Sequence, residues 1–111
     1  MDYGCSSEIP VADPRQEFWT SQRGERGFDN TELWNLDVTI ARFVLPRLKA
    51  FAADLHGCPA SLTLETWGTS LAKMIVSFEL CSAVDFMTAE QEQLISDGLD
   101  LFRKYFHHLC N

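Results

Sequence analysis

Three segments of this chain repeat apolar residues at intervals of three or four positions, and this spacing constrains the fold more than any other feature. Side chains at these intervals lie on one face of an α-helix, whereas a half-buried strand alternates apolar and polar residues. The stripes are Ile40, Val44, Leu48, Phe51 and Leu55; Trp67, Leu71, Met74, Phe78 and Cys81; and Ile95, Leu99, Phe102, Phe106 and Leu109, with Leu94, Gly98, Leu101 and Tyr105 adjoining the third. The sequence therefore predicts an all-α fold, with a three-helix bundle over residues 28–111.

Residues typical of helix ends flank these stripes. Asp37 is expected to be the N-cap of the first helix, and Gly57 its left-handed stop. Thr63 is placed to cap the second helix. Thr88 and Gln91 have the spacing of a capping box, in which each side chain bonds the other residue's backbone N–H.

Pro46 lies inside the first stripe. Proline has no N–H and its ring clashes with the carbonyl of the residue four positions earlier, here Arg42. Because the stripe continues in phase beyond it, we expect a kink there and not a break. Asn30 or Thr31 is expected to start a short turn that runs through Leu36 before this helix.

Residues 1–27 contain prolines, glycines and many polar residues, and they lack a sustained period. The sequence predicts an irregular N-terminal arm with at most one short turn, over residues 14–21. Phe18 and Trp19 form its only large apolar pair, and they are expected to pin the arm to the helical domain.

The chain of 111 residues carries 9 basic and 16 acidic residues, a net charge of −7. Nucleic-acid binding depends on Lys and Arg at phosphates, so direct DNA or RNA binding is not expected, nor is binding to an anionic membrane. With no secretory signal, the cysteines (Cys5, Cys58, Cys81 and Cys110) are expected to be reduced and the protein cytoplasmic.

Candidate catalytic groups are scarce, and no catalytic, cofactor-binding or metal-ligating residue is predicted. His107 and Cys110 could share a metal ion if His56 or Cys58 came near, but a helix-terminal histidine with a buried cysteine is the favoured interpretation.

The candidate binding residues fall into three sets. Trp34 is either a structural anchor or an exposed hot spot for a partner. Asp37, Arg42 and Arg47 are spaced five residues apart around Pro46 and could converge on an anion, with a structural ion pair as the simpler alternative. The acidic set, which would face a basic groove in a partner, is Glu90, Asp97 and Asp100, with Asp29, Glu32, Asp85 and Glu92 as further contributors.

Several strings resemble a family of small proteins encoded by bacteriophages and prophages. They are Thr31-Glu32-Leu33-Trp34-Asn35-Leu36-Asp37, Leu45-Pro46-Arg47-Leu48-Lys49, Lys73-Met74-Ile75 with Phe78-Glu79, and Gly98-Leu99-Asp100-Leu101-Phe102-Arg103-Lys104-Tyr105-Phe106. The resemblance covers residues 29–109; related sequences often end in Leu-Trp-Asp, where this chain has Leu109-Cys110-Asn111. It implies a phage origin and a host-cytoplasm setting, and it implies no catalytic activity.

These observations favour a non-enzymatic phage accessory protein that binds a host or phage protein, with an acidic inhibitor of a host defence nuclease as a specific case. A homo-oligomeric or virion-associated protein that self-associates as a homodimer through the third helix is the second hypothesis. A small hydrolase or metal-binding protein is the third.

Overall fold

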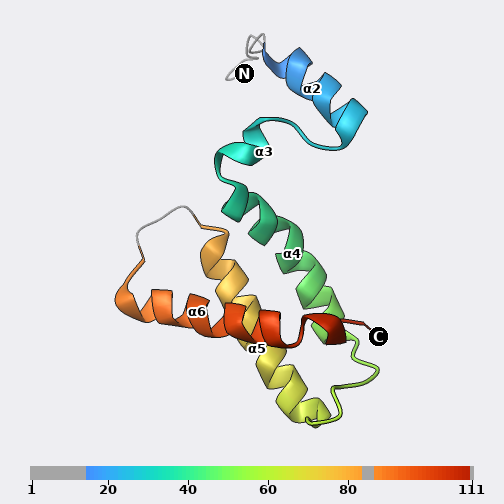
Figure 1. Cartoon of the computed structure of the whole chain (residues 1–111), viewed down its shortest axis with the longest axis vertical. Helices are drawn as coiled ribbons and strands as arrows, with labels where there is room; N and C mark the ends of the chain where they lie inside the picture. The colour runs from blue at the N-terminus through green and yellow to red at the C-terminus, as the bar shows by residue number, and fades with distance from the viewer. Residues whose placement is uncertain (1–14, 84–86, 111) are drawn as a thin grey trace, which may run out of the picture. The chain divides into compact units, whose positions relative to one another are not determined.

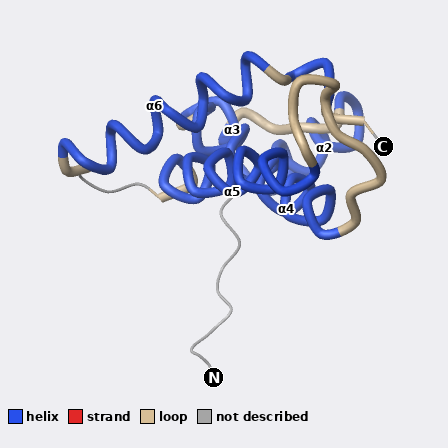
Figure 2. Tube along the Cα trace, turned by 90° about the horizontal axis from the view of Figure 1, so that it is seen from below, coloured by secondary structure: helices blue, strands red, loops and turns tan. Residues whose placement is uncertain are grey.

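The computed structural model describes residues 15–83 and 87–110 (Figure 1). These residues form helices and no strand, which confirms the all-α prediction for them (Figure 2). The elements are α2 (Arg15–Arg26), α3 (Thr31–Trp34), α4 (Leu36–Ala53), α5 (Leu64–Cys81), α6 (Ala89–Lys104) and the 3₁₀ turn η1 (Phe106–His108). The chain divides into two compact units, Met1–Leu36 and Asp37–Asn111, whereas the sequence placed the boundary after residue 27.

The prediction of an irregular arm is wrong for residues 15–26, which form α2. The helix ends at Gly27, whose φ of 84° is the left-handed conformation that glycine adopts without a Cβ clash. The N–H of Gly27 donates to the carbonyl of Arg23 over 2.9 Å and so closes the last turn. Trp19 is buried and meets Trp34 edge-on, with ring centroids 5.8 Å apart, while Phe18 is exposed. Aromatic contact and a glycine stop therefore stabilise a helix whose own sequence is mostly polar.

The second unit has one hydrophobic core built from α4, α5 and α6. Its buried members are Ala41, Leu48, Trp67, Leu71, Met74, Phe78 and Tyr105. Trp67 and Tyr105 meet edge-on at 5.5 Å, and Phe78 and Phe102 do so at 4.9 Å. Such aromatic pairs contribute about 0.5–1.5 kcal/mol beyond the area that they bury.

Capping boxes begin both α5 and α6, as predicted for Thr88 with Gln91. The Thr88 hydroxyl accepts from the Gln91 N–H at 3.1 Å, and the Gln91 side chain accepts from the Thr88 N–H at 2.9 Å. Thr63 caps α5 as predicted, with Thr66 as its reciprocal partner. An N-cap of this kind contributes about 1 kcal/mol.

A close crossing joins α5 to α6, which lies across it (Figures 1 and 2). At this crossing Gly98 is buried against Ser77 and the carbonyl of Lys73. The fully buried Ser77 hydroxyl donates to the carbonyl of Ile95 over 2.9 Å. A Cβ on Gly98 would lie 2.6 Å from the Lys73 carbonyl oxygen and closer still to the Ser77 Cβ. The absence of a side chain at position 98 is thus what lets the two helices approach.

Several expectations for the first predicted helix differ from α4. This helix starts at Leu36, so Asp37 lies in its first turn and is not its N-cap. It ends at Ala53, and Gly57 lies in the following loop without a positive φ, so the predicted glycine stop is wrong. Pro46 lies inside a continuous helix, and the kink expected there stays a prediction.

Four residues of the predicted apolar stripes are exposed. Ile40 is half exposed because α4 is oriented so that Ala41, and not Ile40, faces the core. On the third helix, Leu94, Leu99 and Phe106 are exposed, while Gly98 and Tyr105 of the adjoining stripe are buried. The helix also ends at Lys104, and the residues that follow it form η1.

Candidate functional site

One side of α4 presents large apolar side chains that the core does not cover. Leu36, Ile40 and Phe43 are 48%, 50% and 60% exposed, respectively. Their spacing of four and then three residues places them on one face of the helix, and we call these three residues the α4 face. Amphipathic helices that insert into an apolar groove of a partner use this same spacing of anchors.

Arg47 continues the α4 face one turn further along the helix. Its guanidinium carbon lies 3.7 Å from the centroid of the Phe43 ring, and its Nη1 donates to the Phe43 carbonyl over 2.8 Å. A guanidinium over an aromatic face is attractive and leaves the edge of the ring accessible. Arginine and aromatic residues are enriched at protein interfaces, so this pair has the composition of a binding surface.

The structure does not bring Asp37, Arg42 and Arg47 together. All three are exposed, and among the described residues no ion pair joins either arginine to Asp37. Asp37 instead affects Cys81. The pKa of the Cys81 thiol is raised mainly by burial and, to a lesser degree, by the negative charge of Asp37. An anion site built from these three residues has no geometric support.

Trp34, the predicted hot spot, is 62% exposed at the end of α3. Its indole forms a T-shaped pair with that of Trp19, which belongs to the same unit. Trp34 therefore combines the two alternatives that the sequence allowed: it makes a structural contact, and much of its surface is accessible.

The acidic residues Glu90, Asp97 and Asp100 are exposed on α6 at spacings of seven and three, which place them along one side of the helix. Asp97 accepts from Gln93 over 2.8 Å. Asp97 and Asp100 line a shallow depression of about 340 Å³ together with Lys73, Leu101, Arg103 and Lys104. Three cations therefore share this depression with two carboxylates, which offsets the acidic charge locally.

Residues of α5 and α6 together line a second depression, of about 390 Å³. Thr69, Ala72, Lys73, Val76, Leu94 and Asp97 line it. Its floor is mostly apolar, with one lysine and one aspartate as its charged residues. Neither depression gathers the convergent donors, acceptors and titratable groups that an active site needs.

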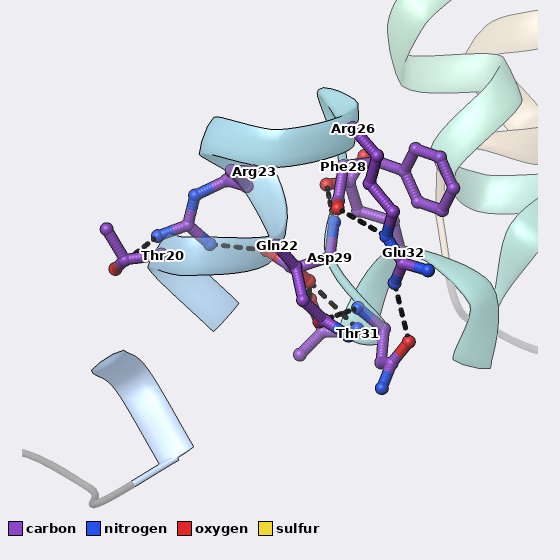
Figure 3. Close-up of polar contacts among 9 residues, drawn as sticks. Thr20, Gln22, Arg23, Arg26, Phe28, Asp29, Thr31 and Glu32 are labelled. Carbon is purple, nitrogen blue, oxygen red and sulfur yellow. Dashed lines mark hydrogen bonds and ion pairs between the residues drawn. The ribbon is translucent and has the colours of Figure 1, made fainter. Parts of the chain in front are cut away.

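Asp29 is the one buried carboxylate among the described residues, and it is fully engaged in structure (Figure 3). Its oxygens accept from the Arg23 guanidinium, from the Thr31 hydroxyl and, over 2.8 Å, from the Thr31 N–H. Its own N–H donates to Glu32 over 3.0 Å. The hydrogen bond from the Thr31 hydroxyl, followed by contacts with Arg23, lowers the pKa of Asp29. A carboxylate held ionised in this way tethers α2 to α3 and is unsuited to act as a general acid.

Comparison of the chain with models of protein families, with curated proteins and with solved structures finds no match. No helix in residues 15–83 and 87–110 has the length and apolar character needed to cross a membrane.

The α4 face was not predicted, because the apolar spacing in the sequence placed Ile40 in the core. The available signal was the 36, 40, 43 spacing of apolar residues, which competes with the 41, 44, 48 spacing on the same helix. A helix with apolar residues on both faces fits more than one orientation, and packing against α5 and α6 selects between them.

Proposed function

We propose that this chain is a non-enzymatic accessory protein of phage origin that binds another protein through the α4 face in the cytoplasm of the host cell. The observation that carries the proposal is the exposure of Leu36, Ile40 and Phe43 on one face of an otherwise core-forming helix. Full burial of a fully exposed side chain of this kind contributes about 1.5–3 kcal/mol. Because these three are already about half buried, each would contribute about half of that, so they can act as the central anchors of a larger interface.

The remaining polar chemistry also fits a binding protein better than an enzyme. The carboxylate oxygens of Asp29 already accept hydrogen bonds from Arg23 and Thr31. The carboxylates of Asp97 and Asp100 on α6 lie in an open depression beside lysine and arginine. Chemistry on a substrate requires groups that converge in a site shielded from water, and the described residues offer no such set.

The net charge of −7 suits a partner with a basic surface. As a specific case, we propose that the partner is a host defence nuclease and that binding inhibits it. Lys73, Arg103 and Lys104 lie beside Asp97 and Asp100, so this part of α6 is not a continuous acidic surface. The proposal therefore rests on the α4 face, while the charge of the chain would mainly affect the rate at which the complex forms.

Paired variants test which surface binds. Ile40→Ser with Phe43→Ser removes the apolar anchors of the α4 face, and both residues are exposed, so the core should be unaffected. Leu99→Ser with Phe106→Ser is the matched control, because it makes the same kind of change at exposed positions of α6 and η1. Each variant is purified by affinity tag from infected cells, and proteins that co-purify in stoichiometric amount are quantified by mass spectrometry.

We expect one protein to co-purify with the wild type and with the Leu99/Phe106 control, and to be lost with the Ile40/Phe43 variant. Retention of that protein by the Ile40/Phe43 variant would remove the α4 face from the proposal. A wild-type chain that recovers no stoichiometric protein would contradict the proposed function itself.

Self-association is the second candidate function, because Leu99 and Phe106 remain exposed on α6 and η1. It predicts a discrete oligomer in light scattering that the Leu99/Phe106 variant dissociates and the Ile40/Phe43 variant leaves intact. A particle that stays monomeric at high concentration would exclude it.

A further inference from the structure

Two histidines and two cysteines from distant parts of the sequence line one cavity in the second unit. The cavity has a volume of about 230 Å³, and His56, Cys58, His108 and Cys110 all line it. The first pair lies in the loop after α4, and the second lies at and just beyond the end of η1. Both views of the chain place the segment after α6 beside the loop that follows α4 (Figures 1 and 2).

Both pairs have the same spacing, His-x-Cys, in residues 56–58 and 108–110. The fold holds each segment by leucines that pack against the core. Leu55 and Leu62 flank the first pair, and Leu109 lies between the two members of the second. Because the core fixes these leucines, it also fixes where the two His-x-Cys segments meet.

We propose that this cavity binds one Zn²⁺ ion through His56, Cys58, His108 and Cys110. Two thiolates and two imidazoles form a ligand set typical of tetrahedral zinc sites, and thiolate ligands disfavour the hard cations Mg²⁺ and Ca²⁺. A bound ion would tie the loop after α4 to the C-terminal segment.

Binding requires the four side chains to move from their present positions. The Cys58 thiol donates to the Leu62 carbonyl over 3.3 Å, and the Cys110 thiol contacts the His107 carbonyl at 4.0 Å. In the described ranges, no three His, Cys, Asp or Glu side chains are already arranged around a metal position. All four ligands are exposed and lie outside the long helices, so their side chains can rotate into the cavity without disturbing the core. Each thiol loses its proton to solvent as it binds the metal.

Asp54 supplies an outer partner for one ligand. Its Oδ2 lies 3.4 Å from Nε2 of His56. Metal-bound histidines usually donate their second ring N–H to a carboxylate, which fixes the ring orientation and strengthens the ligand. With Asp54 at Nε2, His56 would coordinate the ion through Nδ1.

Titration of the reduced full-length chain with Co²⁺, followed by competition with Zn²⁺, tests the site. Tetrahedral Co²⁺ with thiolate ligands has intense visible absorption and a thiolate-to-cobalt charge-transfer band, and Zn²⁺ abolishes both when it displaces the cobalt. We expect a stoichiometry of one ion per chain. Cys58→Ser and Cys110→Ser should each remove part of the charge-transfer intensity and weaken binding more than about 100-fold, because the loss of a ligand exceeds the effect of an outer partner. Asp54→Asn should weaken binding about 10–100-fold.

The chain offers a matched control for each ligand type. Cys81→Ser removes a cysteine that lies outside this cavity, and His107→Gln removes the histidine adjacent to His108 that does not line it. Both controls should bind like the wild type. In the wild type, Zn²⁺ should protect Cys58 and Cys110, but not Cys81, from alkylation, and this readout does not depend on any variant folding.

Weak binding without a charge-transfer band would overturn the proposal. So would equal loss of affinity in Cys81→Ser and Cys110→Ser, or unprotected alkylation of Cys58 and Cys110. None of these outcomes depends on whether the α4 face binds a partner.

Discussion

Replacing Gly98 by alanine probes the crossing of α5 and α6 on which the core depends. The new Cβ would lie 2.6 Å from the Lys73 carbonyl oxygen and closer to the Ser77 Cβ. Neither obstacle is the flexible end of a side chain, so relief requires the helices to separate. Overpacking of this kind costs about 1–3 kcal/mol, and separation also weakens the Ser77–Ile95 hydrogen bond, which contributes about 1 kcal/mol. Alanine returns about 1 kcal/mol through its higher helix propensity.

The net expectation for Gly98→Ala is a loss of about 2 kcal/mol in the free energy of unfolding. For a chain of this size, such a loss lowers the melting temperature by about 8 °C. Gly68→Ala on α5 is the matched control, because no atom lies within 4 Å of the Cβ that it would add. The control should gain up to about 1 kcal/mol from helix propensity. Thermal and urea unfolding followed by circular dichroism measure both variants.

The close crossing requires that alanine lower the free energy of unfolding at Gly98 and raise it at Gly68. If Gly98→Ala is as stable as Gly68→Ala, the two helices do not approach each other as described, and the argument for the core is refuted.

Three further predictions concern the first unit and the thiols. Because the pKa of Asp29 is lowered from 3.8, its tether should stabilise the first unit above pH 3.8 and be lost as the pH falls through the folded-state pKa. The stability difference between wild type and Asp29→Asn, measured by amide hydrogen exchange in α2, should therefore shrink in acid; a difference independent of pH would contradict this. Gly27→Ala should destabilise the end of α2 by about 1–2 kcal/mol, because alanine is strained at a φ of 84°, and unchanged exchange rates there would be the opposing result. In metal-free protein, alkylation followed by mass spectrometry should modify the exposed Cys58 and Cys110 before Cys81, whose partial burial raises its pKa, and faster modification of Cys81 would contradict that assignment.

The elements that the sequence predicted well are those controlled by local interactions. The caps at Thr63 and Thr88 involve residues three positions apart, so their chemistry is visible in a short string. The short turn expected from Asn30 or Thr31 corresponds to α3, which begins at Thr31 with Asn30 before it.

The elements that the sequence missed depend on contacts between distant residues. α2 has a mostly polar sequence with an internal glycine, and its contacts with Trp34 and Asp29 are not visible in its own period. The orientation of α4 likewise depends on which of its two apolar faces meets α5 and α6.

The candidate site shows the same division. The exposure of Trp34 was one of two alternatives that the sequence left open, and the exposed carboxylates Asp97 and Asp100 lie beside lysine and arginine. The α4 face was not anticipated, and an approach of His56 or Cys58 to Cys110 was considered only as a condition. The sequence suggested His107 as the partner of Cys110, whereas it is the next residue, His108, that lines the cavity. Adjacent residues at the end of a helix point in different directions, so the choice between them depends on how the chain leaves α6.

Site-specific photo-crosslinking tests the central claim, that the α4 face binds a partner protein, most directly. A photoreactive phenylalanine analogue is placed at the position of Phe43 or, as a control, at that of Phe106, both of which are exposed. In cells that contain the proposed partner, we expect one crosslinked product of discrete mass from position 43 and none from position 106. Crosslinking from position 106 alone, to a second copy of the chain or to any other protein, would contradict it.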